Sequence, residues 1–249
     1  MGSVWVILPT YNEAENIEAV VGGIRAAAPE AKILVVDDNS RDGTGALADR
    51  LADDVLHRPG KQGLGRAYTA GFARALDHGA DFVCEMDADL SHDPADLPRL
   101  LAPARDGADL VLGSRYVHGG GVENWDLTRR VISLAGCEYA RRVLGVQIRD
   151  LTGGFKCFRA ATLLRIDAQT AGAQGYAFQV ELTYRALLLG LRVVEVPIRF
   201  RERRLGESKM SAQIALEAAW RVPALRHGPR RWRPLEADDL PADPLAHEG

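Results

Sequence analysis

Cysteine is scarce in this chain. The three cysteines, Cys84, Cys137 and Cys157, are odd in number, far apart and set among apolar residues. A disulfide framework needs an even set of cysteines, and a zinc site needs closely spaced Cys or His ligands. The sequence therefore predicts neither a disulfide scaffold nor a zinc site, and it fits a reducing cytoplasm.

Long apolar runs and a strong net charge are also missing. No stretch approaches the 18 apolar residues of a transmembrane helix, and the first residues reach Glu13 and Glu15 without the basic flank of a signal peptide. The formal net charge of −3 lacks the basic excess that binding to nucleic acid requires. We therefore expect a cytoplasmic protein with no nucleic-acid partner. Any membrane contact is expected to be peripheral, at the inner face, or supplied by a membrane-spanning partner.

Several catalytic signatures are absent too. The six histidines show no His-x-x-x-His or His-Cys spacing, and the chain has neither a Gly-x-Ser-x-Gly elbow nor a Walker-type Gly-Lys-Thr loop. The glycine-rich segment 60–65 lacks the strong preceding strand of a dinucleotide fingerprint. These absences argue against catalytic zinc, serine hydrolysis and P-loop chemistry.

What the chain does have is an alternation of short apolar runs with segments of helical period. Strands are predicted near 4–9, 32–37, 81–87 and 109–113, and helices over 14–28, 44–52, 66–78 and 94–105. Further on, the pattern predicts helices near 126–144 and 177–190, a strand at 192–200, and a helix near 211–222 ended by Pro223. Such alternation is typical of an α/β fold with a mainly parallel sheet flanked by helices.

The domain organisation follows from the same pattern. We expect a single catalytic domain over 1–225, with a nucleotide-sugar-binding half at 1–117 and an acceptor-binding half at 118–225. The tail 226–249 is basic, then acidic and proline-rich, and is expected to be disordered. The predicted helix 211–222 and the basic residues after it would either rest on anionic lipid headgroups or form a solvated helix end.

Acidic residues follow three of the predicted strands. Asn12-Glu13, Asp37-Asp38 and Asp87-Ala88-Asp89 each come directly after an apolar run. Open parallel sheets bind ligands outside the carboxyl ends of their strands, so we expect these groups to meet in one site. In an extended chain, Asp87 and Asp89 face the same side, and their oxygens suit one divalent cation. Asp38 is expected to accept hydrogen bonds from a ribose or a base, whereas Asp42 is expected to cap a helix.

Basic residues supply candidate ligands for phosphate, which arginine binds in a bidentate manner and lysine as a point charge. The candidates are Arg115, Arg129, Arg130, Arg203, Arg204 and Lys209. Arg115 follows a predicted strand, and Lys209 belongs to a glycine-containing loop that can close over a diphosphate. His92, close behind Asp89, is expected to be a structural loop residue.

Seven motifs in order carry a resemblance to a known family. They are Pro9-Thr-Tyr-Asn-Glu13, Val36-Asp-Asp-Asn-Ser40-x-Asp-Gly-Thr44, Met86-Asp-Ala-Asp-Leu-Ser-His92, Gly113-Ser-Arg-Tyr116, Leu151-Thr-Gly-Gly-Phe155, Gly175-Tyr-x-Phe-Gln179 and Arg203-x-x-Gly-Glu-Ser-Lys209. From about residue 3 to 215 the chain resembles the dolichol-phosphate or polyprenol-phosphate mannose synthases, inverting family 2 glycosyltransferases with the GT-A fold. The absence of a transmembrane helix resembles the actinobacterial polyprenol monophosphomannose synthases.

The resemblance implies roles for individual residues. The guanosine of GDP-mannose would be held by Pro9, Tyr11, Glu13, Val36 and Asp38. The diphosphate and sugar would meet Asp87, Ala88 and Asp89, and Asp89 would bind Mg²⁺ or Mn²⁺. Phosphate-binding positions are matched by Arg115, Arg203 and Lys209, and the lipid phosphate would be received by Arg115, Arg129 and Ser133. Some relatives place Gln as a second metal ligand two residues after the metal-binding Asp, where this chain has Ser91. Asp89 and Arg115 are the predicted catalytic residues.

The implied reaction is transfer of mannose from GDP-mannose to a polyprenyl or dolichyl monophosphate with inversion. A lipid monophosphate has its second pKa near ~6 and is largely dianionic at neutral pH, so it attacks without a protein base. Two alternatives remain open at this point. One is a polyprenyl-phosphate glucose synthase that uses UDP-glucose, and the other is a non-catalytic nucleotide-sugar-binding module that regulates a membrane partner.

Overall fold

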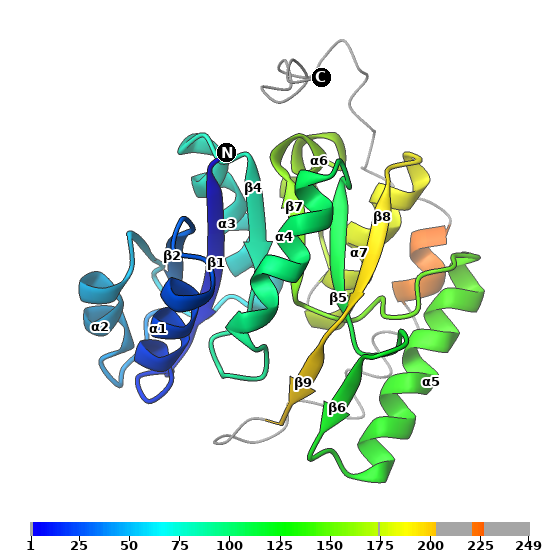
Figure 1. Cartoon of the computed structure of the whole chain (residues 1–249), viewed down its shortest axis with the longest axis horizontal. Coiled ribbons are helices and arrows are strands. Elements are labelled where there is room, and N and C mark those ends of the chain that lie inside the picture. The colour runs from blue at the N-terminus through cyan, green and yellow to red at the C-terminus, as the bar shows by residue number, and fades with distance from the viewer. Residues whose placement is uncertain (1, 174, 203–220, 227–249) are drawn as a thin grey trace.

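A seven-stranded sheet forms the centre of the molecule in the computed structural model, which describes residues 2–173, 175–202 and 221–226 (Figure 1). Its strand order is β3-β2-β1-β4-β7-β5-β8. The strands are β1 (Val4–Thr10), β2 (Lys32–Asp37), β3 (Asp54–His57), β4 (Phe82–Glu85), β5 (Leu110–Ser114), β7 (Lys156–Arg159) and β8 (Val193–Pro197). All neighbours pair in parallel except β7, which is antiparallel to β4 and β5. A small parallel sheet joins β6 (Gly121–Glu123) to β9 (Arg199–Arg201).

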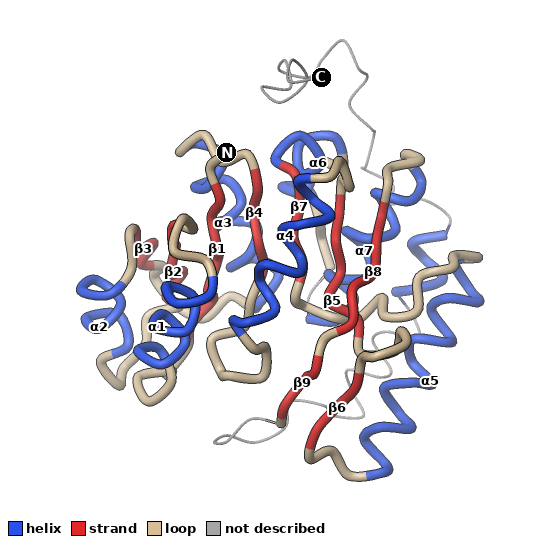
Figure 2. The backbone as a smooth tube through the Cα atoms, viewed as in Figure 1, coloured by secondary structure: helices blue, strands red, loops and turns tan. Residues whose placement is uncertain are grey.

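Helices cover both faces of the large sheet (Figure 2). One face carries α1 (Ile17–Ala27), α2 (Thr44–Leu51) and α4 (Leu97–Arg105), whose buried side chains belong to one apolar cluster. The other face carries α3 (Leu64–Asp77), α5 (Leu127–Leu144), α6 (Ala160–Arg165) and α7 (Gly175–Leu188), whose side chains belong to a second cluster. Two short 3-10 helices, η1 (Pro94–Asp96) and η2 (Ala168–Thr170), connect these elements. The predicted α/β class with a mainly parallel sheet is therefore confirmed.

The central strand β1 is buried on both sides because its side chains alternate between the two clusters. Val6 and Leu8 pack with α1 and α4, whereas Trp5 and Ile7 pack with α3 and α7. Gly71 lets α3 approach the sheet closely, since a Cβ at this position would lie 2.6 Å from Ile7 Cγ2. A run of consecutive apolar residues in β1 is therefore what this position in the sheet requires.

Three strands, β3, β6 and β7, were not predicted from the sequence. β3 and β7 have four residues each, and β7 begins with a charged residue, Lys156, so neither forms an apolar run. The predicted strand at 192–200 is two strands, β8 and β9, which divide at Ile198. Ile198 donates its N–H to Ser114 of β5, and its carbonyl accepts from Gly121 of β6. The chain therefore passes from the large sheet to the small one at this residue.

The C-terminal part differs from the prediction at Pro223. Residues 221–226 are helical, so the predicted helix does not end at this proline. Val222 and Leu225 are buried in the core on either side of this proline. Arg226 donates to the carbonyl of Val143 near the end of α5. Residues 211–220 of the predicted helix and the tail from 227 lie outside the described residues.

None of the helices within 2–173, 175–202 and 221–226 is long and apolar enough to cross a bilayer.

Candidate functional site

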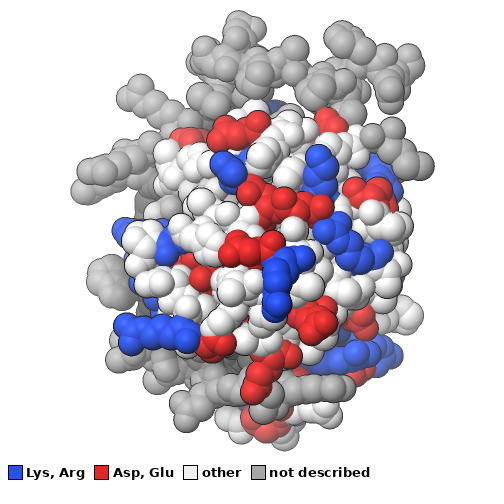
Figure 3. All heavy atoms as spheres, turned by 90° about the vertical axis from the view of Figure 1, so that its left-hand side faces the viewer, with Lys and Arg blue, Asp and Glu red and all other residues white. Residues whose placement is uncertain are grey.

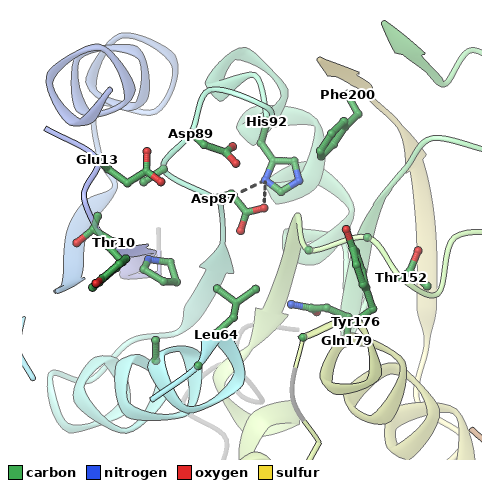
Figure 4. Close-up of a pocket in the computed structure, with 18 of the residues that line it drawn as sticks. Thr10, Glu13, Leu64, Asp87, Asp89, His92, Thr152, Tyr176, Gln179 and Phe200 are labelled. Atoms are coloured by element: carbon green, nitrogen blue, oxygen red, sulfur yellow. Dashed lines mark hydrogen bonds and ion pairs between the residues drawn. The ribbon is translucent and has the colours of Figure 1, made fainter. Parts of the chain in front are cut away.

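A cavity of about 340 Å³ lies at the carboxyl ends of β1, β2 and β4 (Figure 4). Nine of the predicted site residues line it: Pro9, Tyr11, Glu13, Asp38, Asp87, Ala88, Asp89, Arg115 and Arg129. Val36, Ser91 and Ser133 are not among its lining residues, and Arg203 and Lys209 lie outside the described part of the chain. The structure thus brings most of the predicted set together.

Several lining residues were not assigned to the site by the sequence. They are Thr10, Lys61, Gly63, Leu64, Ala67, His92, Trp125, Thr152, Gly153, Gly154, Gly175, Tyr176, Gln179 and Phe200. Four of the quoted motifs, at residues 9–13, 86–92, 151–155 and 175–179, already contained part of this set. Their order along the chain carried the signal, although no single residue type did.

The last residue of β2, Asp37, and Asp42 in the loop after it hold the local structure. Asp37 accepts hydrogen bonds from Thr10 Oγ1 at 2.9 Å and from Ser40 Oγ at 2.6 Å. Asp42 accepts from the N–H and hydroxyl of Thr44, as expected for a residue that fixes the start of α2. Both carboxylates are therefore occupied in joining this loop to its neighbours.

Asp38 faces the cavity from the same loop. Its Oδ1 lies 2.5 Å from Arg58 Nη1, and both side chains are largely buried. Burial raises the pKa of Asp38, while the charge of Arg58 opposes that rise. Nearby, Tyr11 is 36% exposed, and Lys61 Nζ lies 4.1 Å from the centre of its ring. A carboxylate beside an exposed aromatic face can bind the polar edge and the flat face of a nucleoside.

Two carboxylates at the end of β4 face the middle of the cavity. Asp87 accepts from Tyr68 Oη at 3.1 Å, and its backbone N–H donates to Nδ1 of His92 at 3.1 Å (Figure 4). Asp89 Oδ1 accepts from both the N–H and the hydroxyl of Ser91, at 3.0 and 2.5 Å. One oxygen of each carboxylate is therefore held by a neutral donor. Because Nδ1 of His92 accepts this hydrogen bond, that nitrogen carries no proton.

Backbone conformation supports the position of Asp89. Leu90 has φ of 63°, in the left-handed region where a branched side chain is rare. This turn lets Ser91 fold back onto Asp89, and such strain costs about 1–3 kcal/mol and clusters at functional sites. The hydroxyl of Ser91 is fully buried, donates its hydrogen to Asp89 and is not among the lining of the cavity. The geometry favours Ser91 as a residue that positions the carboxylate.

The side chains of this region decide what kind of metal site it can form. Among the described residues, no group of three or more His, Cys, Asp or Glu side chains is arranged to hold a metal ion. Mg²⁺ sites in enzymes commonly use one or two carboxylates and take their other ligands from water and substrate phosphates. Two carboxylates in a cavity fit that kind of site, and they do not fit a cage made wholly by protein.

Arg115 enters the cavity already paired with a carboxylate. Its Nε and Nη2 lie 2.7 and 2.6 Å from Asp150, and Nη2 also donates to Thr152. Arg115 is 6% exposed and Asp150 is fully buried. Burial disfavours both charges, but the pairing outweighs it, so the pKa of Arg115 is raised and that of Asp150 is lowered. The charge that was predicted to meet phosphate is therefore neutralised within the chain.

The other two predicted acceptor residues are also engaged. Arg129 Nη1 lies 2.8 Å from Glu202 Oε1, and its guanidinium lies 4.3 Å from the ring centre of Trp125. Ser133 Oγ accepts the hydroxyl hydrogen of Tyr116 at 2.6 Å. Arg129 lines the cavity. Ser133, on α5, does not line it and is bonded to Tyr116 instead.

Two buried ionisable residues on neighbouring strands lie beneath the cavity. Glu85 on β4 and Lys156 on β7 are register partners, and both are fully buried. Burial raises the pKa of Glu85 to about 8 against the effect of Lys156, and burial lowers the pKa of Lys156 to about 8. Lys156 Nζ donates to the carbonyl of Gln179 and to the hydroxyl of Thr183. The only sequence signal for this pair was a charged residue in an otherwise buried strand.

Fold and site together define the class of this protein. A mainly parallel sheet with paired carboxylates and a nucleoside-sized cavity at its carboxyl edge is the arrangement of a GT-A nucleotide-sugar glycosyltransferase. The sequence matches the family described as "Glycosyl transferase family 2" over residues 5–166. The chain belongs to this family, which confirms the predicted glycosyltransferase activity.

Two curated relatives are similar over most of their length. An undecaprenyl-phosphate mannosyltransferase of Micrococcus luteus is 51% identical over 240 residues, covering 94% of this chain and 98% of the relative. A polyprenol monophosphomannose synthase of Mycolicibacterium smegmatis is 51% identical over 223 residues, covering 87% of this chain and 84% of the relative. The resemblance seen in the sequence motifs is confirmed.

Solved structures with the same fold are more distant. Glucosyl-3-phosphoglycerate synthase from Mycobacterium tuberculosis, in complex with phosphoglyceric acid, superimposes with a TM-score of 0.71 at 20% identity. That match covers 92% of this chain and 82% of the other. The same enzyme in complex with Mn²⁺, UDP-glucose and phosphoglyceric acid gives a TM-score of 0.67 at 21% identity, covering 89% and 80%. These matches confirm the GT-A fold.

Proposed function

We propose that this protein transfers mannose from GDP-mannose to a polyprenyl monophosphate, giving polyprenyl β-mannosyl phosphate and GDP. The observation that carries the proposal is the 51% identity, over nearly the whole chain, to a relative named as an undecaprenyl-phosphate mannosyltransferase. The cavity agrees with it, because one end suits a nucleoside and the middle suits a diphosphate with a divalent cation.

The donor would lie along the carboxyl edge of the sheet. Tyr11 and Asp38 would take the nucleoside at the end of β2, with Pro9 and Glu13 beside them. Val36 is buried in the core, so any contact with the nucleoside would come from its backbone. Asp87, Ala88 and Asp89 would face the diphosphate and the sugar.

Asp89 is the residue that would hold Mg²⁺ or Mn²⁺, with Ser91 fixing its carboxylate. A divalent cation bound there would neutralise the diphosphate and stabilise GDP as it leaves. The structure of a distant fold relative in complex with Mn²⁺ and UDP-glucose supports a divalent cation in this type of site.

The acceptor needs little chemistry from the protein. A lipid monophosphate is largely dianionic at neutral pH, so it attacks the anomeric carbon without a general base. Arg115 and Arg129 line the cavity and would position that phosphate beside the donor, together with Arg203 and Lys209. A single displacement by this nucleophile inverts the anomeric centre, so the product is β-linked.

The acceptor also sets where the enzyme must work. A polyprenyl chain stays in a bilayer, so we expect this protein to meet it through peripheral contact or with the help of a membrane-spanning partner. On the face shown in Figure 3, acidic and basic side chains are interspersed, which does not favour a polyanion such as nucleic acid.

The test is transfer of radiolabelled mannose from GDP-mannose to a short polyprenyl phosphate, with Mg²⁺ or Mn²⁺ and then with EDTA. We expect lipid-linked mannose only with the metal present. A parallel assay with UDP-glucose separates the two donors, and transfer of glucose alone would contradict the assignment of mannose. No transfer from either donor under metal-replete conditions would instead support a non-catalytic, regulatory protein.

A further inference from the structure

One polar side chain at the wall of the cavity has no well-formed hydrogen bond. Gln179 extends from α7 into the cavity (Figure 4), and its side-chain Oε1 and Nε2 are buried without a hydrogen bond of good geometry within the described residues. Its amide lies near the buried carboxyl of Glu85 and lowers the pKa of that group, against the larger effect of burial. The residue is only 2% exposed, so bulk water does not satisfy the amide. A buried polar group left unpaired costs about 1–3 kcal/mol, and most such groups are therefore bonded. An amide without a well-formed hydrogen bond beside a cavity is one that a ligand can satisfy.

A glycine keeps the space in front of this amide open. A Cβ on Gly154 would lie 3.6 Å from Gln179 Nε2, 3.8 Å from His92 Cε1 and 4.0 Å from Asp87 Oδ1. These are ordinary contact distances, so any side chain at this position would fill the volume that the three groups surround. An amide, a carboxylate and an imidazole therefore converge on a space that only glycine leaves empty.

The groups around this space are held in place from behind. The carbonyl of Gln179 accepts hydrogen bonds from Lys156 Nζ at 2.7 Å and from Thr183 Oγ1 at 3.0 Å. Asp87 is held by Tyr68, whose ring stacks with Phe178 on α7. A binding site functions best when its contacts are fixed in this way by supporting residues.

The strand order decides which part of the donor reaches this space. β2, which ends at Asp37 beside Asp38, lies on one side of β1 and β4, whereas β7 and its preceding Gly154 lie on the other side. A nucleotide sugar with its nucleoside at Asp38 and its diphosphate at Asp89 therefore extends its hexose toward Gln179. Hexose hydroxyls both donate and accept hydrogen bonds, and an amide offers two donors and an acceptor.

We infer that Gln179 binds hydroxyl groups of the transferred hexose, in the space that Gly154 leaves open beside Asp87. This inference rests on the proposed function, because it requires that the donor be a nucleotide sugar. Gln179 would thereby discriminate among hexoses, since a sugar whose hydroxyls do not meet the amide leaves buried polar atoms unpaired.

The test compares binding of a nucleotide with binding of the nucleotide sugar. For Gln179→Met, which keeps the length of the side chain, titration calorimetry with Mn²⁺ and no acceptor should show unchanged affinity for GDP. The affinity for GDP-mannose should fall about tenfold, the effect of losing one or two hydrogen bonds. Gly154→Ala should weaken GDP-mannose selectively as well. The matched control is Gly172→Ala, because Gly172 is exposed and a Cβ there meets nothing within 4 Å.

Three outcomes would overturn the inference. Equal losses of GDP and GDP-mannose would assign Gln179 to the diphosphate or to the fold. A rise only in the KM for polyprenyl phosphate would assign it to the acceptor. Unchanged affinity for both would remove it from the site. Failure of the proposed function is a separate result, namely no mannose transfer by the wild-type protein. If that protein binds UDP-glucose instead, the same comparison with UDP and UDP-glucose tests Gln179.

Discussion

The two sides of the cavity hold their charged side chains in opposite ways. On the donor side, Asp87 and Asp89 accept hydrogen bonds from the neutral hydroxyl and N–H groups of Tyr68 and Ser91. On the acceptor side, Arg115 and Arg129 are each paired with a carboxylate, Asp150 or Glu202. The donor side therefore presents carboxylates that suit a divalent cation. The two arginines described on the acceptor side have their positive charge largely neutralised.

This difference suggests how one cavity can bind two anions, the diphosphate of the donor and the phosphate of the lipid. A metal-bound diphosphate meets two carboxylates whose oxygens suit a divalent cation. A lipid phosphate must share its arginines with Asp150 and Glu202, so its attraction is weaker and more dependent on geometry. Since burial makes the pair of Arg115 and Asp150 costly to break, the phosphate is expected to add to that pair instead of replacing it.

The largest expected effect comes from removing the donor-side charge. Asp89→Ala should lower mannose transfer by about 10³-fold or more, because the carboxylate proposed to hold the cation is lost. The protein should remain folded, since the described residues contain no cage of three or more such ligands whose folding depends on a metal. Transfer is measured with radiolabelled GDP-mannose and folding by thermal unfolding.

The control for this variant is Asp49→Ala, whose carboxylate is exposed and pairs with His57 away from the cavity. Its transfer rate should match that of the wild type. Near-normal turnover in Asp89→Ala would contradict the role assigned to the donor side, because transfer would then not depend on this carboxylate.

The next effect tests the neutralised acceptor side. Asp150→Asn should destabilise the protein by about 3–5 kcal/mol, since it leaves the buried charge of Arg115 without its partner. For a chain of this size that corresponds to roughly 10 °C in melting temperature. Differential scanning calorimetry measures the shift, and the KM for polyprenyl phosphate reports whether Arg115 is still positioned.

Asp106→Asn is the matched control, because it breaks an ion pair with Arg192 in which both side chains are more than half exposed. Exposed pairs contribute about 0–1 kcal/mol, so the melting temperature should barely move. If both variants lose the same stability, the pair of Arg115 and Asp150 is no more important than a surface contact.

The donor side was predictable from sequence to a greater extent than the acceptor side. The carboxylates follow apolar strands directly, so strand pattern and the carboxyl-edge rule together bring Asp38, Asp87 and Asp89 into one cavity. The contact that holds Asp89 is local, because Ser91 folds back onto it at the turn of Leu90.

The partners on the acceptor side are far apart in the chain, and no local pattern connects them. Asp150 is 35 residues from Arg115, and Glu202 is 73 residues from Arg129. The antiparallel strand β7 lies between β4 and β5 although it follows both in sequence, and its four residues carry no strand pattern. Pairing over such separations is decided by tertiary packing, which the sequence motifs do not express.

A third effect concerns the boundary between the two sides, where Glu85 on β4 faces Lys156 on β7. The pKa of Glu85 is about 8 in the folded protein and ordinarily 4.5. Between these values the unfolded chain loses its proton first, so folding stability falls as pH rises from about 4.5 to 8. We expect this group to cost on the order of 2 kcal/mol between pH 5 and 7.5.

Glu85→Gln cannot titrate, so its stability should stay level or rise over the same interval, measured by urea unfolding at both pH values. Glu18→Gln is the control, because Glu18 is exposed on α1, and it should keep the slope of the wild type. Equal slopes in all three proteins would mean that Glu85 is ionised throughout and well compensated by Lys156.

The smallest effect asks how far the acceptor side extends along α5. Ser133 was predicted to receive the lipid phosphate, but its hydroxyl accepts from Tyr116 and does not line the cavity. If Ser133 contacts the phosphate, Ser133→Ala should raise the KM for polyprenyl phosphate about threefold to tenfold, the net value of one typical hydrogen bond, and leave the KM for GDP-mannose unchanged. Tyr116→Phe keeps the Ser133 hydroxyl but removes its donor, so it should leave that KM the same or lower it. A rise of equal size in both variants would show that the hydrogen bond between Tyr116 and Ser133 supports the wall of the cavity, and that the phosphate contacts neither residue.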